Sequence, residues 1–314
     1  MERIAFLFPG QGAQYVGMGK DLYENSEVAR SLFEKADRVL NFKLSKLCFE
    51  GPQDMLKKTD ICQPAIFTVS IAAMETLKEL KDLRPDFLAG LSLGEYTALC
   101  AAKALDFADA LLLLRKRGEF MQAAAEENPG KMISIIGLAK EKVNQVARDS
   151  GAEIANLNCP GQIVVSGSSQ EIEIAKQLAQ EAGARKVIAL DVAGAFHSKF
   201  MKKAGLKLEK ELERVDIKMP QAAVVSNVDA RPYKTVAQIK KYLTQQISSS
   251  VLWQDSCEFM LKEGVNKFYE IGPGRVLKGL MGRINANVQV INIQKIEDIL
   301  SLETSNQKPV TREN

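Results

Sequence analysis

An alternation of short apolar runs with longer helical patterns is the feature that most constrains this fold. Residues 4–8 and 86–91 are apolar runs that predict buried strands. Strands that alternate with helices pair in parallel, with helices on both faces of the sheet. The sequence therefore predicts an α/β large domain with a mostly parallel sheet. The helices expected in its first part are 28–40, 65–80, 94–102 and 107–126, the last capped by Asp106.

The pattern of predicted strands and helices changes after Asn128-Pro129-Gly130. The next patterns follow the order β-α-β-β-α-β, which is that of a ferredoxin-like split unit. Its strands are expected at 131–138, 153–157, 162–166 and 185–191, and its helices at 141–150 and 170–182. Alternation then resumes, with helices at 199–213, 236–247 and 276–284 and strands at 222–227, 267–271 and 288–293. We predict a discontinuous large domain (1–128 and 194–296), an inserted ferredoxin-like small domain (129–193) and a polar C-terminal tail (297–314).

Composition excludes several classes of protein. The 314 residues are 46% hydrophobic and 26% charged, which is ordinary for a globular protein, and a net charge of +3 is too balanced to indicate nucleic-acid binding. No stretch approaches 18 uninterrupted apolar residues, and no charged leader precedes a long apolar run, so we expect neither a membrane span nor a signal peptide. The five cysteines form no CxxC pair. We expect no metal, a reducing cytoplasmic location and a monomer.

The string Gly90-Leu91-Ser92-Leu93-Gly94 matches the G-x-S-x-G pattern of a nucleophile elbow. It follows an apolar strand and precedes a helix, as that turn requires. The glycines permit a sharp turn that lifts the serine hydroxyl to the sheet edge, where the helix N-terminus can stabilise an oxyanion. A plain strand-to-helix turn with a serine cap is the alternative. The placement of strand and helix favours catalysis by Ser92.

A serine nucleophile needs a base, and histidine has a pKa in the useful range. The chain has one histidine, His197, directly after the predicted insertion. Aspartate, glutamate or lysine could serve in principle, and a lone histidine at a domain joint is often incidental. The order of serine, insertion and histidine favours His197 as the base.

Two further motifs remain ambiguous on residues alone. The turn at 8–14 has Tyr15 where a dinucleotide fingerprint needs a third glycine, so it is either a plain turn or a second oxyanion donor. Arg117 lies late in an apolar helix, where a cation usually complements the helix dipole. An arginine that faces the site would instead hold a substrate carboxylate through two hydrogen bonds.

Taken together, the motifs resemble malonyl-CoA:acyl carrier protein transacylases, and the likeness runs from about 4 to 293. Each motif alone is modest evidence, but the order and spacing are specific. They are FPGQGAQ at 8–14, QPA at 63–65, GxSLGE at 90–95, RGxxMQ at 117–122, NxPGQ at 158–162, AFHS at 195–198 and EIGPGxVL at 270–277.

The resemblance implies a hydrolase-like large domain and malonyl transfer from malonyl-CoA to an acyl carrier protein through a malonyl-Ser92 ester, with His197 as general acid and base and no cofactor. The backbone N–H groups of Gln11 and Leu93 would form the oxyanion hole, and Arg117 would pair with the malonyl carboxylate. A backbone carbonyl orients the histidine in this family, and the matching position is Gln246, whose side chain is expected to matter little. The other substrate-binding positions implied are Gln63, Met121, Phe196 and Asn158.

The chain departs from the family pattern at two places. Leu91 stands where a histidine usually precedes the nucleophile, and Ser249-Ser250 replaces an Asn-Pro pair. Some acyltransferases of polyketide assembly lines share such variants, so the carrier protein could serve fatty-acid or polyketide synthesis. Two other functions share the same residues: an acyl hydrolase that clears carrier proteins, and a non-catalytic scaffold that binds them.

Overall fold

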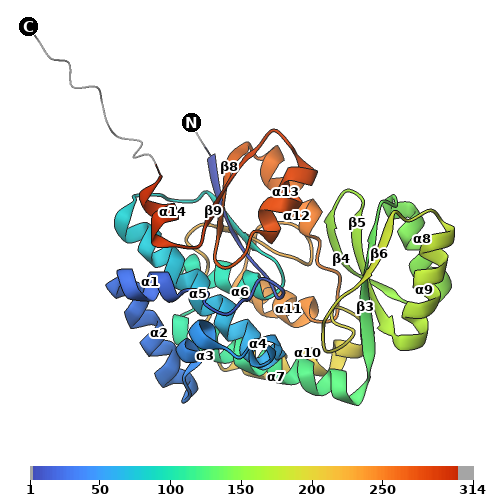
Figure 1. Ribbon diagram of the computed structural model, residues 1–314, viewed down its shortest axis with the longest axis horizontal. Coiled ribbons are helices and arrows are strands. Elements are labelled where there is room, and N and C mark those ends of the chain that lie inside the picture. The colour runs from blue at the N-terminus through green and yellow to red at the C-terminus, as the bar shows by residue number, and fades with distance from the viewer. Residues whose placement is uncertain (1–2, 303–314) are drawn as a thin grey trace, which may run out of the picture.

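The computed structural model describes residues 3–302, which form two sheets with helices around them (Figure 1). The larger sheet has five strands in the order β7-β2-β1-β8-β9, all paired in parallel. Phe8 at the end of β1 lies opposite Gly90 at the end of β2, so the turns that follow these two strands meet at one edge. The strands are β1 (Arg3–Phe8), β2 (Phe87–Gly90), β7 (Ala223–Val225), β8 (Val265–Ile271) and β9 (Gln289–Ile293).

Helices cover both faces of this parallel sheet. In β1, Phe6 and Phe8 point into one core cluster, and Ala5 and Leu7 point into another, as the two-residue period of a strand requires. The described helices of this unit are α1 (Lys20–Asn25), α2 (Glu27–Leu40), α3 (Leu44–Glu50), α4 (Gln53–Lys57), α5 (Thr59–Leu80), α6 (Leu93–Ala101), α7 (Phe107–Glu127), η1 (Lys199–Met201), α10 (Lys202–Glu213), α11 (Val236–Gln246), α12 (Trp253–Lys262), α13 (Val276–Ile284) and α14 (Ile296–Leu300).

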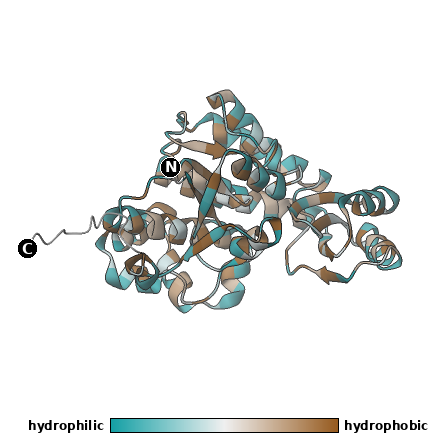
Figure 2. Ribbon diagram, turned by 90° about the horizontal axis from the view of Figure 1, so that it is seen from above, coloured by the Kyte–Doolittle hydropathy of each residue, from teal (hydrophilic) through white to brown (hydrophobic). Residues whose placement is uncertain are grey.

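The second sheet is antiparallel and smaller, with the strand order β4-β5-β3-β6. Two helices pack on one of its faces, and Figure 2 shows them carrying many hydrophilic residues at the end of the molecule away from the large sheet. The predicted α/β fold with a ferredoxin-like unit is confirmed. Its elements are β3 (Gly130–Ile136), α8 (Lys140–Ser150), β4 (Glu153–Cys159), β5 (Gln162–Ser168), α9 (Ser169–Glu181) and β6 (Lys186–Ala189). The exact boundaries at 129 and 193 stay a prediction.

The helix predicted at 65–80 begins six residues earlier in the structure, at Thr59, and carries Pro64 inside it. A proline there cannot donate to the carbonyl four residues back. That carbonyl, on Asp60, instead accepts a hydrogen bond from Nη1 of Arg115 at 3.2 Å. A contact from α7 therefore pairs the carbonyl that Pro64 leaves free, and the sequence does not show that contact.

The short helices α1, α3, α4 and α14, together with α12, were not predicted. Helices of five to seven residues make fewer than two turns, so their apolar spacing is hard to recognise. The predicted polar tail is wrong over residues 297–300, because α14 lies there and Ile299 is buried in the main core. Residues 303–314 of that tail lie outside the described part. No helix within residues 3–302 is long and apolar enough to cross a membrane.

Candidate active site

Ser92 stands at the turn between β2 and α6, in a strained backbone conformation with φ 54° and ψ −103°. Its two flanking glycines allow very close packing. A Cβ on Gly90 would lie 2.0 Å from the carbonyl of Gly94, and one on Gly94 would lie 2.3 Å from the carbonyl oxygen of Phe8. No other residue fits at either position without a backbone shift. The turn has the geometry of a nucleophile elbow.

His197 lies directly against the serine. Its Nε2 is 2.9 Å from Oγ of Ser92, and its Nδ1 is 2.8 Å from the backbone carbonyl oxygen of Gln246. A carbonyl only accepts, so Nδ1 carries the proton and donates it there. Nε2 is then free to accept the Ser92 hydroxyl proton. The one imidazole of the chain thus occupies the place of a base.

Burial lowers the pKa of His197 to about 4, and the positive charge of Arg117 acts in the same direction. The backbone carbonyl of Gln246 opposes this shift by accepting from the ring. The imidazole is therefore neutral at pH 7, which is the state that can take a proton.

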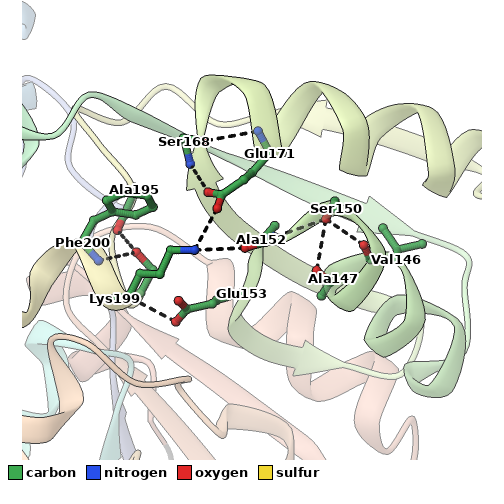
Figure 3. A network of polar contacts seen from close by, with 12 residues as sticks. Val146, Ala147, Ser150, Ala152, Glu153, Ser168, Glu171, Ala195, Lys199 and Phe200 are labelled. Atoms are coloured by element: carbon green, nitrogen blue, oxygen red, sulfur yellow. Dashed lines mark hydrogen bonds and ion pairs between the residues drawn. The ribbon is translucent and has the colours of Figure 1, made fainter.

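Figure 3 shows how the segment after the histidine is tied to the small sheet. Nζ of Lys199 donates to Glu171 at 2.8 Å and to the carbonyl of Gly151 at 3.2 Å, and its backbone N–H donates to Glu153 at 3.1 Å. Glu171 also closes the capping box of α9 with Ser168. His197 itself has a positive φ of 57°. These contacts help to hold a strained segment in place. Lys199, at the start of η1, therefore links the large unit to the small one.

Arg117 lies in the middle of α7 with its side chain buried, so a dipole role at the helix end is wrong. Its guanidinium donates to the side-chain oxygen of Gln63 at 2.7 Å, to Oγ of Ser92 at 2.8 Å and to Oε1 of Gln246 at 3.0 Å. It also lies over the ring of Tyr96, at 5.6 Å. Burial lowers the pKa of Arg117. Among the ion pairs found in residues 3–302, none joins Arg117 to a carboxylate, so the site holds a cation ready for an anion.

A cavity of about 480 Å³ opens beside Ser92 and is lined by the small sheet and by turns and helices around the large sheet. Gln11, Leu93, Met121, Phe196 and Asn158 all line it, as do Leu91, Ser134 and Asn156. Leu93 is the first residue of α6, where a backbone N–H has no intrahelical acceptor. Gln63 and Gln246 do not line the cavity. They lie behind Arg117 and contact it.

The small sheet presents polar atoms to this cavity. Oγ of Ser134 and Oδ1 of Asn158 are buried and have no hydrogen-bond partner among the residues described. Buried polar atoms are nearly always paired in folded proteins. Both side chains line the cavity, but these two oxygen atoms have almost no accessible surface, so a ligand reaches them only if the side chains turn.

A buried polar network behind the elbow was missed in the sequence. The side chain of Asn227 accepts from the N–H of Ser92 at 2.7 Å and donates to the carbonyl of Gly90 at 2.8 Å. Glu95 accepts from the N–H of Asn227 at 3.2 Å, from Nε2 of Gln246 at 2.6 Å and from the hydroxyl of Tyr233. Burial raises the pKa of Glu95 to about 7. Of these network residues, only Glu95 could be noticed in the sequence, because it is the one charged residue of a mainly apolar helix.

The side chain of Gln246, which was expected to matter little, makes several contacts in the site. Its amide contacts Arg117, Glu95 and the carbonyl oxygen of Ser92, the last at 3.0 Å. The main chain and the side chain of this one residue thus contact the ring of His197, the backbone of Ser92 and the guanidinium of Arg117. The sequence pattern concerned only the carbonyl, so it carried no information on the amide.

A parallel α/β sheet with an elbow serine in contact with a histidine defines the class of α/β enzymes that handle acyl groups. The family described as acyl transferase domain matches residues 5–296, so the chain belongs to the acyl transferase family and is an acyltransferase. The malonyl CoA-acyl carrier protein transacylase of Bacillus subtilis (strain 168) is 47% identical over 310 residues, which are 97% of this chain and 98% of that protein. This confirms the resemblance drawn from the motifs.

Two further relatives widen the comparison. The polyketide biosynthesis malonyl CoA-acyl carrier protein transacylase of the same organism is 41% identical over 294 residues, 92% of this chain and 99% of that protein. A solved malonyl-transacylase in complex with its type II polyketide acyl-carrier protein has a TM-score of 0.93 and 35% identity, covering 95% of this chain and 98% of that one. The similarity therefore extends over the whole described fold.

Proposed function

We propose that this enzyme transfers a malonyl group from malonyl-CoA to the phosphopantetheine thiol of an acyl carrier protein through an ester on Ser92. The observation that carries the proposal is the contact of Ser92 with both His197 and Arg117 beside one cavity. The names of the relatives support the same substrates. No cofactor is needed, because a thioester is already activated.

In the first half-reaction, Oγ of Ser92 attacks the thioester carbonyl while Nε2 of His197 takes its proton. The N–H groups of Gln11 and Leu93 stabilise the oxyanion. The carbon–sulfur bond then breaks, and the imidazolium returns its proton to the departing CoA thiolate. The carbonyl of Gln246 keeps the ring oriented and stabilises its charged form.

In the second half-reaction, the carrier-protein thiol gives its proton to His197 and attacks the ester. The carbon–oxygen bond breaks, and Ser92 recovers its proton. The two large substrates use the site in turn, which gives ping-pong kinetics. Arg117 holds the malonyl carboxylate throughout, with Met121 and Phe196 as walls of the acyl site.

The proposal is tested by incubating the protein with malonyl-, methylmalonyl- or acetyl-CoA and measuring its intact mass. We expect a malonyl adduct that a carrier protein removes as malonyl thioester. No adduct on freshly purified protein would refute the proposal, and release of free malonate with the carrier protein unloaded would indicate the hydrolase instead. One relative is named for polyketide biosynthesis and the other is named without a pathway, so the carrier protein could serve fatty-acid or polyketide synthesis. The cytoplasmic location and the monomeric state stay predictions.

A further inference from the structure

The side-chain amide of Gln246 lies between two groups of opposite hydrogen-bonding character. On one side Nη2 of Arg117, which can only donate, lies 3.0 Å from Oε1. On the other side Oε2 of Glu95 lies 2.6 Å from Nε2, and the carbonyl oxygen of Ser92 lies 3.0 Å from it. Oδ1 of Asn227 is a third acceptor, 3.4 Å from Nε2. The reversed amide would place an acceptor against three acceptors and a donor against a donor. The surroundings therefore impose one orientation.

Oε2 of Glu95 faces a second N–H, that of Asn227, at 3.2 Å. An oxygen that faces two N–H donors acts as an acceptor and carries no proton. The other oxygen of Glu95 contacts the hydroxyl of Tyr233. The two carboxyl oxygens thus have separate tasks: one contacts the Gln246 amide, and the other contacts a tyrosine away from the site.

We propose that Glu95 is a positioning residue for malonyl recognition, whose Oε2 orients the Gln246 amide so that its oxygen holds the guanidinium of Arg117. The inference rests on the proposed function, because it concerns the group that reads the malonyl carboxylate. The Ser92–His197 contact and the backbone carbonyl of Gln246 do not pass through this amide. The amide nitrogen also contacts the carbonyl oxygen of Ser92, so its loss should slow both transfers to some extent. Only malonyl transfer also needs the guanidinium that the amide oxygen holds, so malonyl transfer should fall more than acetyl transfer.

Two substitutions of Glu95 separate the position of its carboxyl group from its negative charge. Glu95→Asp keeps the carboxylate but withdraws it by one methylene from the Gln246 amide. Glu95→Gln keeps the length, and its amide oxygen can replace Oε2 while its amide nitrogen donates to the oxygen of Tyr233. A role in orientation predicts that the charge-conserving variant is impaired and the neutral one is not.

The experiment measures the second-order rate of adduct formation on Ser92 with malonyl-CoA and with acetyl-CoA. We expect Glu95→Asp to lower the malonyl-to-acetyl ratio about tenfold or more, as for a misplaced substrate-positioning group. Glu95→Gln should stay within about threefold of the wild-type ratio, because each hydrogen bond is replaced. Tyr233→Phe is the matched control, since it removes a contact of Glu95 without touching Gln246, and its ratio should be unchanged even where its Tm falls.

Several results would overturn the inference. If the malonyl-to-acetyl ratio falls in Glu95→Gln but is unchanged in Glu95→Asp, the negative charge of Glu95 matters and not its position. If Glu95→Asp slows acylation by malonyl-CoA and by acetyl-CoA equally, the role of Glu95 is merely structural. The same conclusion follows if the malonyl-to-acetyl ratio falls as much in Tyr233→Phe as in Glu95→Asp. If Glu95→Asp does not fold, Gln246→Leu, which keeps the backbone carbonyl, must lower the ratio, and an unchanged ratio counts against the inference. Absence of any wild-type adduct would instead refute the proposed function.

Discussion

The cleft has two walls, and we call the one formed around Ser92 the elbow wall. There, hydrogen bonds join the hydroxyl of Ser92, the imidazole of His197 and the guanidinium of Arg117 into one network, which continues to the buried carboxyl of Glu95. On the small-sheet wall, Ser134 and Asn158 keep buried oxygens that have no partner within residues 3–302. Nε of Arg117, in the elbow network, also has no partner among the residues described. The first wall is preorganised for a chemical step. Within residues 3–302, the second wall lines the same cavity with side chains that keep these two oxygens unpaired.

The largest effect should come from the centre of the elbow wall. Ser92→Ala removes the only group that we expect to carry the acyl ester, so the malonyl adduct should disappear from the intact mass. A serine-directed phosphonate should label the wild type and not the variant. A stoichiometric malonyl adduct on Ser92→Ala would place the nucleophile elsewhere.

His197→Ala should slow acylation by about 10²–10⁴-fold, the usual scale for loss of a general acid–base group. The fold and the oxyanion donors remain, so slow acylation should persist. Rapid-quench mass measurement of the adduct checks this value. A rate within a few-fold of the wild type would show that another group takes the Ser92 proton.

Arg117→Ala should reduce acylation by malonyl-CoA by about 10²-fold or more, since a desolvated charge pair is worth several kcal/mol. The acetyl group lacks the carboxylate, so its acylation should fall much less. Measuring both adducts side by side provides the comparison. Equal losses for the two substrates would refute the role of Arg117 as a reader of the carboxylate.

The pH dependence of acylation should follow the lowered pKa of His197. Above about pH 5 the imidazole is neutral and the rate should be flat; it should halve near pH 4 and fall about tenfold per pH unit below that. Because the pKa in the unfolded chain is near 6.5, the same group favours the folded state above pH 6.5, and this contribution is lost as the pH falls towards 4. An inflection of the rate near 6.5 would contradict the buried, neutral imidazole.

The smallest effect should come from the small-sheet wall. Asn158→Ala should raise KM a few-fold with little change in kcat, because one hydrogen bond to a bound substrate contributes about 1 kcal/mol. Ser166→Ala is the matched control: Ser166 is buried and equally unpaired in the same sheet, but it does not line the cavity. A change in kcat alone would show that Asn158 acts in the chemical step and not in substrate binding. The two walls would then differ less in function.

Much of the fold followed from local patterns. The period-two strands, the elbow glycines and the Asp106 cap each act over a few residues, so the sequence displays them directly. The extension of α5 to Thr59 did not follow, because it depends on Arg115 of another helix. The same holds for Asn227 and Tyr233, which lie far along the chain from the elbow that they support.

By itself the sequence determined the order of the strands and of most of the longer helices, the serine at the turn, the single imidazole and the arginine. These are properties of residue type and short spacing. Only the tertiary structure decided that Arg117 points inward, that the Gln246 amide joins it to Glu95, and that one wall of the cleft is paired while the other is not. Those facts depend on which side chains share a buried space, and burial is set by the packing of distant segments.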